Sequence, residues 1–241
     1  MTQSTTIFPG EVFADPTLFD TGIRQLLPHY EQMLDTLVAC VPSTTCRLLE
    51  LGCGTGELGL KLLKRCPDAH LVAVDYSPRM LVLAEAKLTK AQLNHRVTFI
   101  QEDFGAWAKG ELPDSIGTDF ESCVSSLAIH HLTDEMKQQL FSCIGENLVQ
   151  GGCFWNADPI LQESSQLQEI YSALREKWTM AQGTTITEIR SQIGSSVPQG
   201  YSGQDRLATL ESHCTMLTQA GFNTVAVPWR FLGLAIFGGW I

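Results

Sequence analysis

The sequence predicts an α/β fold with a mostly parallel sheet, and three observations support this. Short apolar runs alternate with segments of helical periodicity between about residues 47 and 157, and strands that alternate with helices usually pair in parallel. A glycine-rich turn, Gly52-Cys53-Gly54-Thr55-Gly56, follows the first apolar run. The chain ends in two strand-like runs with no helix between them. Its 241 residues suffice for one domain with a full core, so we expect a single domain over residues 1–241.

Each predicted element follows from a local signal. An amphipathic helix is expected over Tyr30–Cys40, and Pro42 ends it; with the mixed segment before it, this helix forms a predicted N-terminal helical cap, residues 1–45. Ser77-Pro78 begins a later helix, as an N-cap followed by proline at the first helical position. The other core helices are expected over Leu58–Arg65, Thr133–Leu148 and Arg206–Ala220, and the parallel strands over Arg47–Leu51, Leu71–Asp75, Val97–Gln101, Phe120–Ser125 and Cys153–Ala157.

The pattern breaks between Pro159 and Asp205, where one clear helix is predicted, about Gln166–Met180. We interpret residues 159–205 as a lid inserted between the fifth strand and the last core helix, because insertions at strand ends usually cover a binding site. The runs Thr224–Pro228 and Phe231–Phe237 are expected to form a terminal hairpin, and Gln150-Gly151-Gly152 a turn into the fifth strand.

The composition of the chain limits the kinds of molecule that it is expected to bind. The formal net charge is −10, and an acidic chain without a basic run is a poor match for nucleic acid. No apolar stretch has membrane-spanning length, and residues 1–10 lack the features of a secretory signal, so no membrane partner and a cytoplasmic location are expected. The eight cysteines show no C-x-x-C pair and are interpreted as buried free thiols. We expect a monomer or a homodimer.

The glycine-rich turn and Asp75 point to a nucleoside-containing cofactor. Glycines allow unusual backbone angles and a close approach of ligand to main chain, and an acid at the tip of the second strand suits ribose hydroxyls. A dinucleotide fingerprint would require a third glycine where Glu57 stands. A carboxylate there would repel a diphosphate, and Glu50 adds negative charge, which favours a cofactor with a sulfonium and an amino group.

The segment from Glu50 to Gly56 resembles motif I of the class I S-adenosylmethionine-dependent methyltransferases, E/D-x-G-x-G-x-G, at every defining position. The segments 124–132, 151–152 and 217–222 are similar to the fourth-strand, fifth-strand and final-helix motifs, although Val149-Gln150 replaces the common Lys-Pro. The resemblance covers nearly the whole chain. It implies a Rossmann-like seven-stranded sheet with an antiparallel last strand, helices on both faces, S-adenosyl-L-methionine as cofactor, and methyl transfer to O, N or C of a small metabolite.

The resemblance also assigns cofactor contacts. The methionine half falls to the loop and the end of the fourth strand, the ribose to Asp75, and the adenine to residues after the second and third strands. Three of these have a structural alternative: Asp75 as a turn cap, Asp103 as a turn acid, and Met80 as core. The full set is Glu50, Gly52, Gly54, Gly56, Asp75, Tyr76, Met80, Asp103, Phe104, Ser126 and Leu127.

Catalysis of methyl transfer needs mainly positioning, with a base where the acceptor must lose a proton. His130 and His131 follow the fourth strand, and Asp158 ends the fifth. Adjacent side chains are expected to point apart, so one histidine faces the acceptor; we prefer His130 as base, with Asp158 orienting the acceptor. Their alternatives are a loop or helix-capping histidine and a turn acid. No metal-ligand cluster stands out, so metal independence is predicted.

Two other functions stay open from the sequence. One is a methyltransferase for RNA or protein, which the acidic charge and the lack of a basic face disfavour. The other is a cofactor-binding partner subunit without turnover, which the intact glycine motif disfavours.

Overall fold

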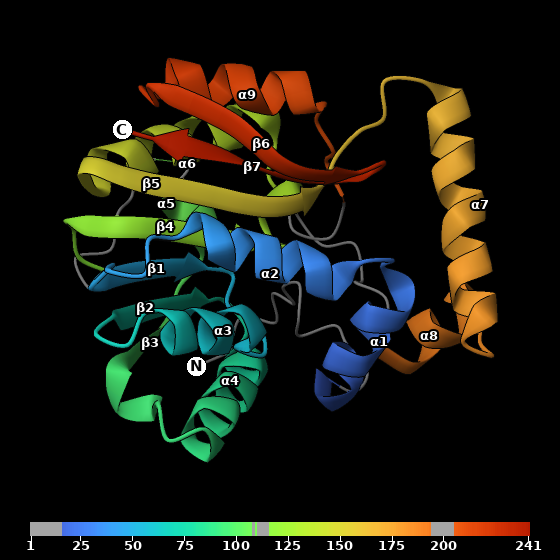
Figure 1. Ribbon diagram of the computed structural model, residues 1–241, viewed down its shortest axis with the longest axis horizontal. Helices are drawn as coiled ribbons and strands as arrows, with labels where there is room; N and C mark the ends of the chain where they lie inside the picture. The colour runs from blue at the N-terminus through green and yellow to red at the C-terminus, as the bar shows by residue number, and fades with distance from the viewer. Residues whose placement is uncertain (1–15, 108, 110–115, 194–204) are drawn as a thin grey trace, which may run out of the picture.

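The computed structural model describes residues 16–107, 109, 116–193 and 205–241. Residues 1–15 of the predicted cap and 194–204 of the predicted lid lie outside the described residues. Seven strands form one sheet in the order β3-β2-β1-β4-β5-β7-β6 (Figure 1). The strands are β1 (Arg47–Leu51), β2 (His70–Asp75), β3 (Val97–Gln101), β4 (Phe120–Ser126), β5 (Leu148–Pro159), β6 (Thr224–Phe231) and β7 (Leu234–Trp240).

The direction of the strands confirms the predicted sheet. The first five strands pair in parallel, whereas β7 runs antiparallel to β5 and β6 antiparallel to β7. The carboxyl ends of β1 to β5 therefore meet along one side of the sheet, which is where ligands bind in open α/β folds.

Helices cover both faces of the sheet, as predicted, because successive strand residues point to opposite sides. Leu48 of β1 belongs to one apolar core, together with α2 and α3. Its neighbours Leu49 and Leu51 belong to a second core with α6 and α9. The helices of the two layers are α2 (Tyr30–Cys40), α3 (Glu57–Arg65), α4 (Pro78–Lys90), α5 (Phe104–Trp107), α6 (Asp134–Asn147) and α9 (Leu210–Gln219).

Three further helices lie together at the carboxyl end of the parallel strands: α1 (Phe19–Leu26), α7 (Ser165–Ala181) and α8 (Ile186–Ile193) (Figure 1). The sequence analysis did not predict α8. Side chains of α7 hold the end of α1, because Arg175 Nε donates to the Leu26 carbonyl at 3.2 Å and Trp178 Nε1 to the Arg24 carbonyl at 3.3 Å. The N-terminal helix and the inserted segment thus contact each other directly.

Several predicted boundaries were wrong, among them that of the last strand, which was expected over Phe231–Phe237 and is observed over Leu234–Trp240. The glycines at 151–152 lie inside β5, where the register with β4 shifts, so the expected turn is an irregularity within a longer strand. Helix α9 begins after Thr209 rather than at Arg206, because the Thr209 hydroxyl caps it by accepting from the Ser212 N–H at 3.1 Å. The strand β6 continues past Pro228 to Phe231, which an edge strand tolerates since it needs fewer N–H donors.

Candidate functional site

The glycine loop and Asp75 are in direct contact. The Gly54 N–H donates to Asp75 Oδ2 at 2.7 Å. The N–H groups of Gly52 and Cys53 both donate to the Val74 carbonyl, at 2.8 and 3.0 Å. The ends of β1 and β2 therefore lie close enough for one molecule to touch both. The capping alternative also holds, because Asp75 Oδ1 accepts from the Ser77 N–H at 2.8 Å.

The three glycines of the loop have different structural roles. All adopt positive φ, at 69° for Gly52, 52° for Gly54 and 76° for Gly56, a region that side chains disfavour. A Cβ on Gly52 would lie 2.4 Å from the Cβ of Ala128, and one on Gly56 would lie 3.0 Å from that of Ala84. A Cβ on Gly54 would have no described atom within 4 Å. Gly52 and Gly56 thus permit packing, while Gly54 leaves room for a ligand.

The acidic residues around the loop carry less free charge than their sequence positions indicate. Glu50 is buried on the α3 side of β1, and its Oε2 has no hydrogen-bond partner among the described residues. Burial, and next the nearby Asp75 carboxylate, raise the pKa of Glu50 to about 8. The carboxyl is therefore mostly protonated at neutral pH.

Glu57 is not free to repel a phosphate either. Its carboxylate pairs with Arg24 Nη2 at 2.6 Å and with Lys87 Nζ at 2.8 Å. Burial alone raises the pKa of Glu57, but the Lys87 and Arg24 partners outweigh it and the net pKa lies below its ordinary value. The argument that an acidic loop would repel a diphosphate was therefore wrong, because Glu50 is mostly protonated and Glu57 is paired with two cations.

The residues predicted for the adenine lie after β2 and β3. Asp103 caps the short helix α5, because its Oδ1 accepts from the Gly105 N–H at 2.8 Å. Phe104 reaches the loop, with its Cε1 3.5 Å from the position of a Cβ on Gly52. Tyr76 is half-buried. Met80 is buried on α4 in line with Ala84, which agrees with its alternative as a core residue.

The end of β4 also approaches the loop. Leu127 adopts a left-handed backbone at φ 55°, a conformation that is uncommon for a branched side chain. Its N–H donates to the Ala157 carbonyl at 2.9 Å. The preceding Ser126 has a buried hydroxyl without a hydrogen-bond partner in the described part of the chain. A buried polar group of this kind calls for a partner, and a ligand can supply one.

The structure brings His130 and Asp158 together. His130 lies in the 3₁₀ turn Ile129–His131 after β4, and Asp158 lies near the end of β5. His130 Nδ1 and Asp158 Oδ1 are 2.8 Å apart, and both side chains are buried. The second oxygen of Asp158 accepts from Asn156 Nδ2 at 3.0 Å. The carboxylate therefore holds the imidazole by Nδ1, and Nε2 stays outside this hydrogen bond.

This pair is electrostatically coupled. Burial alone lowers the pKa of His130, but the Asp158 carboxylate outweighs it and the net pKa lies above the ordinary 6.5. Burial alone raises the pKa of Asp158, and the charge and hydrogen bond of His130 more than reverse this. A carboxylate that raises the basicity of an oriented imidazole is the arrangement used by general bases.

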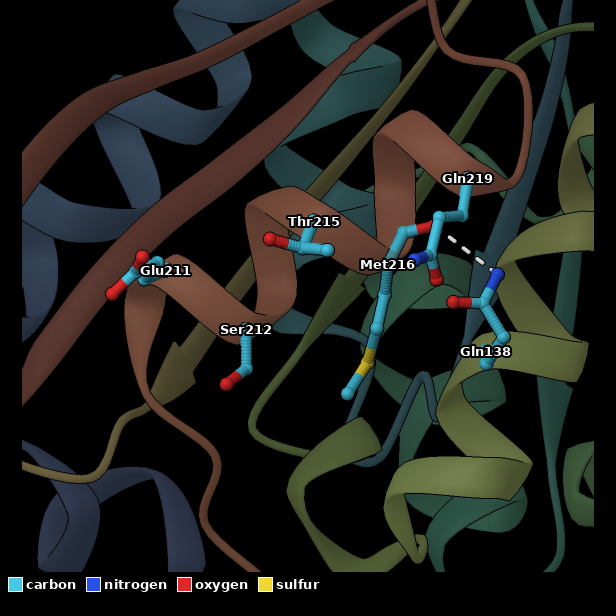
Figure 2. Close-up of a pocket in the computed structure, with 6 residues that line it drawn as sticks. All are labelled: Gln138, Glu211, Ser212, Thr215, Met216 and Gln219. Carbon is cyan, nitrogen blue, oxygen red and sulfur yellow. Dashed lines mark hydrogen bonds between the residues drawn. The ribbon is translucent and has the colours of Figure 1, made fainter.

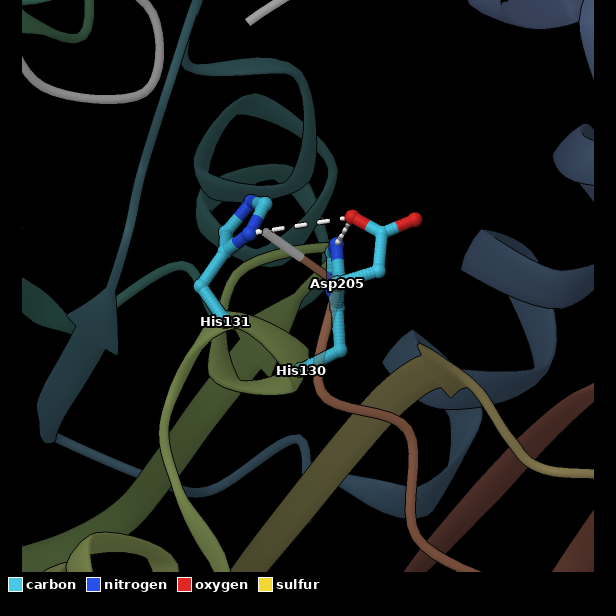
Figure 3. Close-up of side chains that lie close together, drawn as sticks. All are labelled: His130, His131 and Asp205. Atoms are coloured by element: carbon cyan, nitrogen blue, oxygen red, sulfur yellow. Dashed lines mark ion pairs between the residues drawn. The ribbon is translucent and has the colours of Figure 1, made fainter. Parts of the chain in front are cut away.

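The expectation that His130 and His131 point apart was wrong. Their ring centroids lie 4.1 Å apart, and both rings face Asp205 (Figure 3). Asp205 Oδ1 lies 3.6 Å from His130 Nε2 and 3.8 Å from His131 Nδ1. The tight 3₁₀ turn and the carboxylate, which attracts both rings, account for the shared direction. Sequence reasoning missed Asp205, which is 74 positions beyond His131 and carries no local signal.

The same three side chains could hold a metal ion. One ligand atom from each of His130, His131 and Asp205 lies within 4.8 Å of the others, and imidazole with carboxylate suits several divalent cations. Asp205 is 66% exposed, so such a site would be open to solvent. Metal independence therefore stays a prediction, and this cluster is the place where it can fail.

Two buried groups behind His130 were also missed. The Lys137 ammonium on α6 is fully buried and pairs with Asp134 Oδ1 at 2.9 Å and with the Arg206 carbonyl. His213 on α9 is buried and stacks on Phe237, and burial lowers its pKa to about 4. A neutral His213 beside a buried cation leaves His130 as the partner of the Asp158 charge.

A separate groove lies between α6 and α9 (Figure 2). Its volume is about 390 Å³, and it is shallow and open. The groove is lined by Gln138, Glu211, Ser212, Thr215, Met216 and Gln219. None of these residues belongs to the predicted site.

Comparison with known proteins gives a match to one family over part of the chain. Residues 48–152 match the family described as a methyltransferase domain. This match and the relatives below support a class I S-adenosylmethionine-dependent methyltransferase, an enzyme that uses S-adenosyl-L-methionine as cofactor. The matched residues contain both the glycine loop and His130.

Relatives share the fold at low identity. An uncharacterized methyltransferase from Bacillus thuringiensis is 28% identical over 158 residues, which are 66% of each chain. A putative O-methyltransferase from Nostoc punctiforme is 14% identical, with a TM-score of 0.63 over 95% of this chain and 62% of that one. A phosphoethanolamine N-methyltransferase from Haemonchus contortus, in complex with S-adenosyl-L-methionine, is 22% identical, with a TM-score of 0.56 over 82% and 38%. The chain thus covers less than two thirds of these solved relatives.

None of the helices in the described part of the chain has the length and apolar character needed to cross a bilayer.

Proposed function

We propose that this chain transfers the methyl group of S-adenosyl-L-methionine to a small metabolite. The acceptor atom is a heteroatom that carries a hydrogen, foremost a hydroxyl oxygen. The observation that carries the proposal is the buried pair of His130 Nδ1 and Asp158 Oδ1, 2.8 Å apart, at the carboxyl ends of β4 and β5. A base oriented in this way serves an acceptor that must lose a proton. Nitrogen and carbon acceptors are the weaker fits.

The reaction is an in-line displacement. A lone pair of the acceptor oxygen forms the new bond to the methyl carbon while the bond between sulfur and methyl breaks. The acceptor proton passes to His130 Nε2, and Asp158 stabilises the imidazolium that forms. S-adenosyl-L-homocysteine and the methylated product then leave. The protein supplies orientation and a base, since the sulfonium already activates the methyl group.

Two observations support a small acceptor. The formal net charge of −10 disfavours a polyanionic substrate. Helices α1, α7 and α8 lie together at the carboxyl end of the parallel strands, the same end as the glycine loop (Figure 1). The related solved enzymes include a putative O-methyltransferase and a phosphoethanolamine N-methyltransferase, which supports a hydroxyl or an amine. We assign residues 159–193 and 205 to the acceptor side as a lid.

The test is methyl transfer from radiolabelled cofactor to a panel of phenols, aliphatic alcohols, amines, tRNA and a protein mixture. We expect label in one or more of the small hydroxyl compounds and none in the macromolecules. Label in tRNA or protein alone would overturn the proposed acceptor class. Binding of the cofactor without transfer to any acceptor would favour a non-catalytic subunit.

A further inference from the structure

A cluster of four charged side chains and one hydroxyl joins the N-terminal helix α1 to the glycine loop. It consists of Asp20 and Arg24 on α1, Thr55 and Glu57 at the loop, and Lys87 on α4. We call these five residues the loop clamp. The cluster connects three elements: the cap, the end of β1, and the helix that follows Asp75 on β2. No residue of the clamp is among the predicted cofactor contacts.

Asp20 on α1 binds both Thr55 of the loop and Lys87 of α4. Its Oδ1 accepts from the Thr55 hydroxyl at 2.5 Å, and its Oδ2 pairs with Lys87 Nζ at 2.5 Å. Thr55 is only 5% exposed and stands between Gly54 and Gly56. A single carboxylate of the cap helix therefore fixes the one side chain that the loop carries between these glycines.

Glu57 and Lys87 complete the clamp. Lys87 Nζ has three acceptors, because besides Asp20 it donates to Glu57 Oε2 at 2.8 Å and to the Thr55 hydroxyl at 3.3 Å. Glu57 also pairs with Arg24 on α1. The side chains of Lys87 and Glu57 are 21% and 19% exposed, so solvent screens them less than a fully exposed pair.

We propose that Asp20, Glu57 and Lys87 are positioning residues for the cofactor. Thr55 directly follows Gly54, the glycine with open space around it, and Glu57 lies three residues beyond Gly54; the Gly54 N–H is the group that contacts Asp75. When Thr55 and Glu57 are held in place, the Gly54 amide stays hydrogen-bonded to the Asp75 carboxylate in the protein without cofactor. Loss of the clamp leaves the glycines free to sample other angles, which binding must then reverse.

Two consequences follow. Cofactor affinity depends on the docking of α1, although no clamp residue needs to touch the cofactor. Affinity also falls as ionic strength rises, because salt weakens the clamp. The inference does not depend on the acceptor, so its test stands apart from the test of the proposed function.

The experiment is calorimetric titration of the full chain with S-adenosyl-L-homocysteine, which carries no net charge and is thus itself little affected by salt. We expect Lys87→Met and Asp20→Asn each to weaken binding by about 10-fold or more, within the usual range of coupling between sites. Lys87→Arg keeps the charge and should restore most of the affinity. The matched control is Arg230→Met, which removes the ion pair of Arg230 on β6 with Glu163, at 2.7 Å, and shares no partner with the clamp; we expect a change within about twofold.

The dependence on salt separates positioning from simple stability. Wild-type affinity should fall between low and high sodium chloride, and the Asp20→Asn variant, which keeps its size and is expected to fold, should lose most of that dependence. The proposal is overturned if Lys87→Met and Asp20→Asn bind as tightly as the wild type, or if Arg230→Met weakens binding as much as they do. Melting temperatures measured alongside ensure that all titrations use folded protein.

Discussion

The two ends of the candidate site are built in different ways. The glycine-loop end, Gly52–Gly56 with Asp75, uses backbone groups from one short segment and a single carboxylate. The histidine end, His130, His131, Asp158 and Asp205, uses side chains from segments far apart in the chain. The comparison shows that a binding site made of backbone can be recognised in a short motif, whereas a site made of side chains depends on how the whole sheet and its insertion fold.

The largest effect is expected at the histidine end. His130→Ala should lower kcat by about 10²–10⁴-fold, the usual contribution of a general base, without changing cofactor affinity. His131→Ala is the matched control in the same turn and should change kcat much less. The measurement is steady-state transfer to whichever acceptor the wild type methylates. Equal losses for the two variants would contradict the assignment of the base.

The same residue predicts the pH dependence of the rate. The base must be neutral, and the pKa of His130 is raised above 6.5, so kcat should fall as pH decreases through that raised value. Asp158→Asn removes the carboxylate that raises the pKa, and this acidic limb should then move to lower pH. An acidic limb that does not move in Asp158→Asn would show that another group titrates.

At the glycine-loop end, the loss should appear in binding instead. Asp75→Ala removes a carboxylate that holds the Gly54 amide and is assigned to the ribose, and it should weaken cofactor binding by about 100-fold, as loss of charged hydrogen bonds does. Asp103→Ala serves as the comparison, since one hydrogen bond to adenine contributes less. Retention of wild-type affinity in Asp75→Ala would break the assignment of this end.

Substitutions at Gly52 and Gly54 test whether these two glycines of the loop have different roles. Gly52→Ala places a Cβ 2.4 Å from that of Ala128 and should destabilise the fold by about 1–3 kcal/mol, as overpacking does. Gly54→Ala meets no described atom and should cost less stability but more cofactor affinity. Urea unfolding and calorimetry on both variants check this. Identical profiles for the two would mean that the glycines have one shared role.

The last prediction concerns Glu50 and the dependence of stability on pH, an effect that bears on folding and not directly on the reaction. Its pKa is about 8 in the folded chain and ordinarily 4.5, so the folded state retains a proton that the unfolded state releases. Wild-type stability should therefore decrease as pH rises from about 4.5 to about 8 through this group, by about 1.4 kcal/mol for each unit of pKa difference that is realised. Glu50→Gln cannot titrate, and its advantage over the wild type should grow across this range. Parallel stability curves in urea unfolding at pH 5, 6.5 and 8 would contradict the raised pKa.

Much of the fold could be predicted from the sequence because each element carried a local signal. The Ser77-Pro78 start of α4 and the alternation around Leu48 and Leu49 both rest on neighbouring residues. Errors arose where tertiary contacts set the boundary. Gly151 reads as a turn from its neighbours, but the pairing of β5 with β4 keeps it within the strand. The helix α8 carries isoleucines at helical spacing, Ile186, Ile189 and Ile193, a signal that the sequence analysis overlooked, and it packs against α1.

The candidate site divides in the same way. The pairing of Gly54 with Asp75 was predictable, because the ends of adjacent parallel strands meet. The sequence analysis placed His130 and Asp158 at the ends of β4 and β5, which pair, but it assigned Asp158 to the acceptor and did not predict its contact with His130. Asp205 and the loop clamp were not predictable, because they come from the insertion and the cap, whose placement no local pattern specifies. The protonation of Glu50 was hidden for a related reason: burial on the α3 side of β1 sets its pKa.

The most direct test of the account is a crystal structure of the chain with bound S-adenosyl-L-homocysteine. The account predicts the ribose hydroxyls on Asp75, the amino acid part against Gly52–Gly56, and the sulfur directed toward the space in front of His130 Nε2. A cofactor whose sulfur faces away from His130, with other side chains between them, would contradict it.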